Sequence, residues 1–147
     1  MRATVKSPLS GKVVPLEEVA DEVFSERVMG DGVAVRPTEG RVLAPASGTI
    51  EKLFPGGHGV VIETPEGVQI LVHVGLDTVE LKGDGFDVHA AEGETTSEGR
   101  LLVTVDLDRM AEFKVDLVSP VVVISGHSVE ARASGDVAAG DDLFGVL

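Results

Sequence analysis

The sequence predicts an all-β fold, an antiparallel β-sandwich built from related hairpin units with one or two short helical turns. Eighteen glycines and seven prolines divide the 147 residues into short Val-rich segments, a pattern typical of sandwiches and barrels. The motif SPLSGKV at 7–13 recurs as APASGTI at 44–50, and each copy places a Pro-led turn before a strand. A chain of this length suits one domain over residues 1–147 with a substantial core.

The predicted strands are the Val- and Ile-rich segments that lie between Gly, Pro and polar residues. In chain order they cover residues 3–5, 11–15, 33–37, 41–44, 48–54, 59–64, 68–74, 85–88, 101–106, 121–125, 131–133 and 143–146. Helical signals are weaker. One turn is expected over 16–19 and two turns over 107–114, where Asp106 or Asp108 would be the N-cap.

The best-defined hairpin is signalled by the turn TPEG at 64–67. It has Pro at the second turn position and Gly at the fourth, as tight turns between antiparallel strands commonly do. If these four residues close the hairpin symmetrically, Glu63 faces Val68 and His58 faces His73. Directly opposed residues have Cβ atoms roughly 5 Å apart, so the two imidazoles are predicted to meet.

In this register Val60 faces Leu71 next to the histidines, so His58 and His73 would lie in a shallow apolar patch. Three chemistries use such a pair. In the first, one neutral imidazole attacks phosphorus and forms a phosphohistidine, while the other donates a hydrogen bond to the phosphoryl oxygens. In the second, both bind Zn²⁺ and Asp77 completes a hydrolase site. The third, a general-base role, ranks last because no second nucleophile lies beside the pair. Spacing alone leaves the first two open.

Charge and composition narrow the class of partner. The chain has 25 acidic and 12 basic residues and a formal net charge of −13, which argues against nucleic acid or an anionic membrane and favours a basic protein. The absence of cysteine excludes a disulfide and agrees with a reducing cytoplasm. No apolar run approaches the ~20 residues of a membrane span. We therefore expect a soluble cytoplasmic protein without intrinsic membrane insertion.

Three stretches strongly resemble the glucose-family enzyme IIA component of the bacterial phosphoenolpyruvate-dependent sugar phosphotransferase system. They are SPLSGKVVPLEEVADEVFSERVMGDGVAVRPTEG at 7–40, VLAPASGTIEKLFPGGHGVVIETPEGVQILVHVGLDTVELKGDGF at 42–86 and SPVVVIS at 119–125. The run LVHVGLDTVELKG is the most specific of these motifs. The resemblance covers nearly the whole chain, so it implies one enzyme IIA (glucose-type) domain.

The resemblance implies a phosphotransferase-system protein that carries one phosphoryl group on a histidine in a shallow surface depression. The phosphocarrier protein HPr would donate the group, and a cysteine of a IIB domain would accept it for sugar transport and phosphorylation. On the matching motif, His73 is the acceptor, phosphorylated on Nε2 as tele-phosphohistidine, and His58 is the companion that orients the group. No metal or cofactor is implied. Regulatory protein targets are further partners that the family suggests.

The same matching assigns partner-binding residues around the histidines. Asp21 and Asp77 match rim carboxylates that would meet an arginine of the basic donor. We also expect Gly75 or a neighbouring carbonyl to accept from Nδ1–H of His73, which would fix the tautomer. The apolar collar comprises Val23, Phe24, Val28, Met29, Phe54 and Leu71.

Three positions depart from the family pattern. Gly56 stands where the family often has a threonine that hydrogen-bonds the companion histidine, and Leu71 stands where an aromatic residue is often found. Glu22 replaces an apolar rim residue. These departures concern the surroundings of the histidines and the fit to partners, rather than the histidines themselves.

Overall fold

The computed structural model describes residues 3–147. Its strands and short helices follow one another, from the N-terminal end, as β1 (Ala3–Lys6), β2 (Gly11–Pro15), the 3₁₀ helix η1 (Leu16–Glu18), α1 (Glu22–Ser25), β3 (Asp31–Pro37), β4 (Arg41–Leu43), β5 (Gly48–Leu53), β6 (Gly59–Glu63), β7 (Gln69–His73), the 3₁₀ helix η2 (Thr78–Leu81), β8 (Phe86–Val88), β9 (Thr95–Thr96), β10 (Leu101–Val105), α2 (Leu107–Phe113), β11 (Ser119–Val123), β12 (Val129–Glu130), β13 (Asp136–Val137) and β14 (Asp142–Val146).

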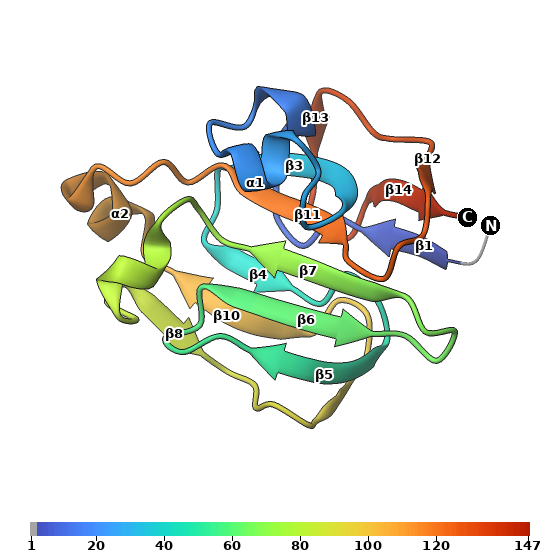
Figure 1. The fold of residues 1–147 in the computed structure, drawn as a ribbon. Helices are drawn as coiled ribbons and strands as arrows, with labels where there is room; N and C mark the ends of the chain where they lie inside the picture. Colours follow the sequence, from blue (N-terminus) through green and yellow to red (C-terminus); the bar gives the residue numbers. More distant parts are fainter. Residues whose placement is uncertain (1–2) are drawn as a thin grey trace.

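The strands form one large sheet and two small ones, and their pairs are antiparallel. The large sheet has the order β13-β2-β3-β11-β7-β6-β5-β9, and the small sheets have the orders β4-β10-β8 and β1-β14-β12. In Figure 1, β5, β6 and β7 of the large sheet lie in front of β4 and β10. The predicted all-β antiparallel sandwich is therefore confirmed. None of the helices in residues 3–147 has the length and apolar character of a membrane span.

Each face of the large sheet is covered by its own apolar cluster. Between the sheets, the main core takes Val60 of β6 and Val72 of β7 together with residues of β4, β10 and β14. On the outer face, a second cluster takes Val61 and Leu71 from the same two strands together with Phe24 of α1. The two clusters follow from strand alternation, since successive side chains point to opposite faces. The histidine site lies on the outer face.

The β6–β7 hairpin differs by one residue from the predicted register. His73 pairs with Gly59, not with His58. The backbone N–H of Thr64 donates to the carbonyl of Val68, so the loop contains three residues rather than four. Its last residue, Gly67, has a φ of +85°, which identifies a turn followed by a left-handed residue that adds a bulge.

The one-residue shift also overturns the predicted pairing of Val60 with Leu71. Val60 pairs with Val72 and faces the main core, whereas Leu71 pairs with Val61 and faces outward. The prediction that Val60 lies next to the histidines is therefore wrong: Val60 packs in the main core, whereas the His58 ring reaches the outer site described below.

Other differences from the predicted elements are local. The strand expected over 131–133 is replaced by β12, and Ala131 has a left-handed φ of 53° that ends this pairing. The short elements α1, η2, β9 and β13 were not predicted. The helix predicted over 107–114 is confirmed as α2, and Asp106 is its N-cap because its carboxylate accepts from Arg109 N at 3.1 Å.

Candidate histidine site on the outer face

The two histidines lie in contact even though they are not paired in the ladder. Their ring centroids are 5.3 Å apart with an interplanar angle of 77°. His73 ends β7, and His58 immediately precedes β6, where its carbonyl still accepts from Val74 N at 2.7 Å. His58 is thus anchored by its backbone at the end of the hairpin, outside the regular alternation of β6. The predicted proximity of the two rings is confirmed, although the predicted register is wrong.

Aromatic rings hold the pair from two sides. Opposite His73, Gly59 leaves room for Phe54, because a Cβ at this glycine would lie 2.7 Å from Phe54 Cδ2. The Phe54 ring lies 5.3 Å from the His58 ring and 6.3 Å from the His73 ring. Phe24 contacts His73 from α1 at 5.4 Å between centroids. The absence of a side chain at Gly59 therefore lets the Phe54 ring lie against the two imidazoles.

Backbone carbonyls fix which nitrogen of each ring carries the proton. Nδ1 of His73 lies 2.7 Å from the carbonyl oxygen of Gly75, and Nδ1 of His58 lies 3.2 Å from that of Pro55. A carbonyl oxygen can only accept, so Nδ1 is the donor in both rings. In the neutral form, each ring consequently keeps a lone pair on Nε2. The expected hydrogen bond from His73 to Gly75 is confirmed.

Both rings are biased toward the neutral form. Burial lowers the pKa of His73 below 6.5, and this effect exceeds the opposing influence of the Gly75 carbonyl, Asp21 and Asp77. The pKa of His58, which is only 4% exposed, is also lowered, first by burial and then by the neighbouring His73 ring. Near pH 7 the site therefore presents unprotonated Nε2 atoms.

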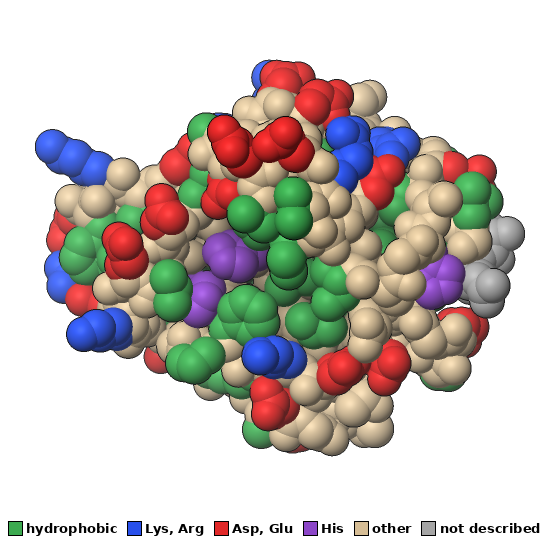
Figure 2. All heavy atoms as spheres, in the orientation of Figure 1, with side chains coloured by type: hydrophobic (Ala, Val, Ile, Leu, Met, Phe, Trp, Pro, Cys, Tyr) green, Lys and Arg blue, Asp and Glu red, His purple; other side chains and the backbone are tan. Residues whose placement is uncertain are grey.

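A hollow of about 260 Å³ opens over His73. Figure 2 shows histidine atoms beside a cluster of hydrophobic side chains, with acidic side chains at the border. The predicted residues Asp21, Asp77, Val23, Phe24, Met29, Phe54 and Leu71 all line this hollow. The predicted collar residue Val28 does not line the hollow. It precedes the lining residue Met29 in the chain and is 72% exposed.

The lining residues divide into a floor and a rim. Phe24 and Leu71 are 5% and 1% exposed, so they form the floor. Val23 and Met29 are 43% and 39% exposed and form the apolar rim together with Val79, which is 58% exposed. Sequence reasoning missed Val79, although it lies within the specific run LVHVGLDTVELKG. Its position on a 3₁₀ turn, which was not predicted, brings it to the rim.

The two rim carboxylates are positioned by local backbone geometry. Asp21 is the N-cap of α1, where its carboxylate accepts from Val23 N at 3.0 Å. Asp77 precedes η2 with a left-handed φ of 58°, a conformation that aspartate tolerates better than most residues. Within residues 3–147, no three His, Asp or Glu side chains are grouped so that they could hold a metal ion. Asp77 therefore does not complete a zinc site with the two histidines.

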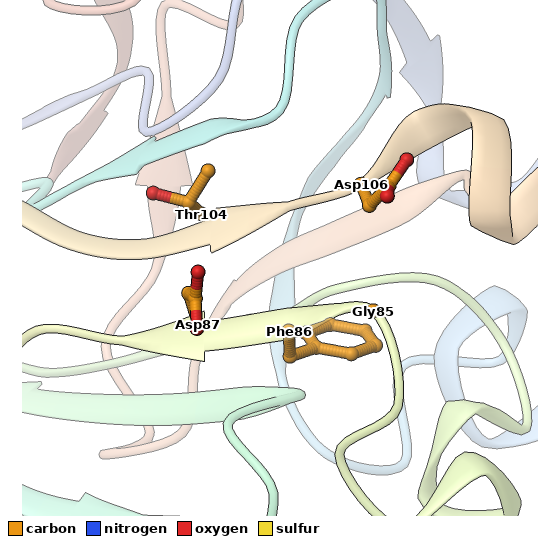
Figure 3. Close-up of a pocket in the computed structure, with 5 residues that line it drawn as sticks. All are labelled: Gly85, Phe86, Asp87, Thr104 and Asp106. Carbon is orange, nitrogen blue, oxygen red and sulfur yellow. The ribbon is translucent and has the colours of Figure 1, made fainter.

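A larger hollow of about 420 Å³ lies elsewhere, on the paired strands β8 and β10 and the residues next to them (Figure 3). It is lined by Gly85, Phe86, Asp87, Thr104 and Asp106. Asp87 and Thr104 are opposed across the β8–β10 ladder, and Asp106 is occupied as the N-cap of α2. The lining of this hollow contains no histidine, whereas the smaller hollow is lined by His73, whose ring contacts His58. We therefore assign the functional site to the smaller hollow over His73.

The remaining two histidines contact hydroxyl groups away from the site. Nε2 of His89 lies 2.8 Å from Thr104 Oγ1, and Nδ1 of His127 lies 2.7 Å from Ser125 Oγ. Neither lines the hollow that contains His73.

Comparison with known proteins identifies a family and a similar solved structure. Residues 3–129 match the family described as phosphoenolpyruvate-dependent sugar phosphotransferase system, EIIA 1. The structure is similar to that of glucose permease IIA from Mycoplasma capricolum, with 39% sequence identity and a TM-score of 0.92. That match covers 97% of this chain and 94% of the other chain.

Proposed function

This chain belongs to the EIIA 1 family of the phosphoenolpyruvate-dependent sugar phosphotransferase system, and we propose that it carries the phosphoryl group on His73, with His58 as the companion. As a component of that system it is a phosphocarrier. The observation that carries the assignment of His73 rather than His58 is that His73 lines the open hollow, whereas His58 is only 4% exposed and does not line it. The 2.7 Å contact between Nδ1 of His73 and the Gly75 carbonyl leaves the lone pair of Nε2 for the transfer.

In the proposed transfer, the lone pair on Nε2 of His73 attacks the phosphorus atom of the donor phosphohistidine. A new N–P bond forms, the donor N–P bond breaks, and the donor ring keeps its electron pair. The proton on Nδ1 of His73 remains hydrogen-bonded to Gly75. In the second step, a cysteine thiolate of the IIB domain attacks the same phosphorus, and His73 is released. Such transfers depend mainly on positioning and charge stabilisation, and a residue at the end of a packed strand is well held.

His58 is proposed to respond to the charge that arrives. Its ring is neutral in the unphosphorylated protein because burial and His73 lower its pKa. A phosphoryl group on His73, whose ring centroid is 5.3 Å away, adds negative charge beside it. An adjacent anion favours the imidazolium form, so His58 would take a proton on Nε2 and donate it in a charge-assisted hydrogen bond to a phosphoryl oxygen.

The rim supports successive contacts with HPr and a IIB domain, the partners implied by the family. Asp21 and Asp77 would repel an isolated phosphoryl group, so their charges suit a cationic partner that balances them in the complex. The exposed rim side chains Val23, Met29 and Val79 provide apolar contact area around the carboxylates. We place this exchange in the cytoplasm, in agreement with a chain that has no cysteine.

The test is intact-mass measurement after incubation with phosphoenolpyruvate, enzyme I and HPr. The parent protein is expected to gain one acid-labile phosphoryl group, His73→Gln none, and His58→Gln one group that is passed on slowly to a IIB domain. The linkage is read by NMR of the phosphorylated ring, which is expected to show phosphorus on Nε2. A parent protein that stays unmodified, a His73→Gln variant that is still phosphorylated, or a linkage through Nδ1 would each contradict the proposal.

A further inference from the structure

The turn after β7 supplies the carbonyl group on which the His73 tautomer depends. Gly75 has a φ of +75°, and glycine is free to adopt many other conformations. The peptide groups on either side of Gly75 therefore need partners if its carbonyl is to keep one direction. The structure supplies such partners on both sides.

The peptide group that follows Gly75 is held at both of its polar ends. Its carbonyl oxygen faces His73 Nδ1 at 2.7 Å, and its N–H, which belongs to Leu76, donates to the carbonyl of Asp116 at 2.9 Å. This second bond uses only backbone atoms. It would persist after most side-chain substitutions, so a side chain that steers Gly75 must act on the other peptide group.

The peptide group that precedes Gly75 is held by two hydroxyl groups. Its carbonyl, from Val74, accepts from Thr78 Oγ1 at 2.6 Å, and its N–H, from Gly75, donates to Ser119 Oγ at 3.1 Å. The Ser119 hydroxyl in turn donates to the carbonyl of Leu117 at 2.7 Å. Because that carbonyl can only accept, the hydroxyl proton is committed and an oxygen lone pair faces Gly75.

The Ser119 hydroxyl is buried, so water cannot take its place as the acceptor of the Gly75 N–H. Ser119 has an exposed fraction of 0%, and it begins β11, which pairs with β7 through Val121 and Val72. The sheet that carries His73 therefore also fixes the distance from Ser119 to Gly75. Loss of the hydroxyl would leave a buried N–H without a partner, which is unfavourable.

We propose that Ser119 is a positioning residue for phosphoryl transfer. Its hydroxyl holds the Gly75 peptide in the orientation that keeps the proton of His73 on Nδ1 and leaves Nε2 free. This inference rests on the proposed function of His73, but it makes a separate claim about the ring tautomer. That claim is measurable in the unphosphorylated protein.

The test uses three substitutions at Ser119 and one matched control. Ser119→Ala removes the hydroxyl, Ser119→Cys leaves a weak donor and acceptor, and Ser119→Thr retains a hydroxyl. The control is Ser7→Ala. Ser7 is also a buried serine, 1% exposed, and its hydroxyl donates to the carbonyl of Leu9 at 2.6 Å. It follows β1, which belongs to a different sheet.

Two quantities are measured on each folded variant: the fraction of His73 rings with the proton on Nδ1, by ¹⁵N NMR, and the rate constant of phosphorylation by HPr. Ser119→Ala is expected to lower the Nδ1–H fraction and to slow phosphorylation by roughly 10- to 100-fold, the range typical for outer hydrogen-bond partners of metal-binding histidines. Ser119→Cys is expected to be intermediate. Ser119→Thr and Ser7→Ala are expected to match the parent protein.

An unchanged Nδ1–H fraction of His73 in Ser119→Ala would overturn the inference. It would also be overturned if Ser7→Ala lowered this fraction as much as Ser119→Ala does. If Ser119→Ala does not fold, the other two variants decide: the inference requires a lower Nδ1–H fraction in Ser119→Cys than in Ser119→Thr, and equal fractions would overturn it. A different result would contradict the proposed function. If the parent protein has the His73 proton on Nδ1 but accepts no phosphoryl group, the role proposed for His73 is wrong. The NMR comparison would still test the positioning by Ser119.

Discussion

Burial of His73 and His58 supplies neutral ring nitrogens without a dedicated base, as the proposed transfer requires. Desolvation is the first cause that lowers the pKa of each ring below 6.5, and the carbonyl partners of the two Nδ1 atoms then direct the free lone pairs to Nε2. In the proposed transfer the attacking nitrogen would already be unprotonated, so no group would have to remove a proton from it. Such a site would need charge control more than acid–base catalysis.

We predict that NMR titration of the unphosphorylated protein gives ring pKa values below 6.5 for His73 and His58. After phosphorylation of His73, the pKa of His58 is expected to rise, since the added negative charge stabilises the imidazolium. The measurement follows the ring carbon protons against pH in the parent protein and in each His→Gln variant. A His58 pKa that falls or stays constant on phosphorylation would contradict the role given to this ring.

The same pKa shifts have a consequence for stability. The folded-state pKa values lie below the unfolded value of 6.5, so as pH falls through 6.5 the unfolded chain binds protons first. The free energy of unfolding is then expected to decrease with falling pH until the folded-state pKa is passed. His73→Gln and His58→Gln should each weaken this pH dependence, which urea unfolding at several pH values measures.

At the level of single residues, much of the site could be predicted from the sequence. The run LVHVGLDTVELKG marks His73 and Asp77, and GGHG marks His58. Pro55, Ser119 and Thr78 could not be found in this way, because they act through a carbonyl or a hydroxyl whose direction depends on the folded backbone. Hydroxyl residues are common in turns, and the sequence does not distinguish those that hold a functional loop.

At the scale of elements, the β6–β7 hairpin shows why strand register could not be predicted from the sequence pattern alone. The residues TPEG at 64–67 form the turn, and Gly67 N donates to Thr64 O at 2.9 Å. If all four turn residues lie in the loop, Glu63 pairs with Val68. If the last turn residue forms a bulge, Thr64 pairs with Val68 instead, and the register of the whole hairpin shifts by one residue. The left-handed φ of Gly67 selects the second. The contact between the histidines survives because His58 lies beyond the paired part of β6.

We predict that Gly67→Ala destabilises the protein by about 1 kcal/mol, because an L-residue is strained at this φ. The space around Gly67 is open, with no atom within 4 Å of an added Cβ, so the cost is conformational rather than steric. Gly67→Asn is expected to cost less, since asparagine tolerates the left-handed region. The two variants are compared by urea unfolding. A Gly67→Ala variant as stable as the parent would contradict the bulged turn.

At the scale of the whole molecule, the net charge of −13 and the acidic rim act together. An excess of negative charge attracts a basic partner over a distance of several ångströms, and salt screens this attraction. The exposed apolar side chains of the rim, Val23, Met29 and Val79, then provide contact at short range. In the proposed transfer, charge would bring the partner to the face that carries His73, and the apolar rim would surround this histidine.

We therefore predict that Asp21→Asn and Asp77→Asn each slow phosphorylation by HPr at low salt, mainly through slower association. A rim charge is typically worth about 0.5–1 kcal/mol, a factor of roughly 2–5 in rate. Asparagine is also a good N-cap, so Asp21→Asn removes the charge while it retains the start of α1. The measurement is kcat/KM for phosphorylation across a range of salt concentrations.

The matched control is Asp87→Asn, which changes the net charge equally but lies on β8 at the other hollow (Figure 3). If the total charge alone steers the donor, all three variants lose activity to the same extent. If the rim carboxylates meet the donor directly, the two rim variants lose more and their rates depend less on salt than the rate of the parent protein. We expect the second result, because Asp21 and Asp77 line the hollow over His73, where the donor phosphohistidine must approach.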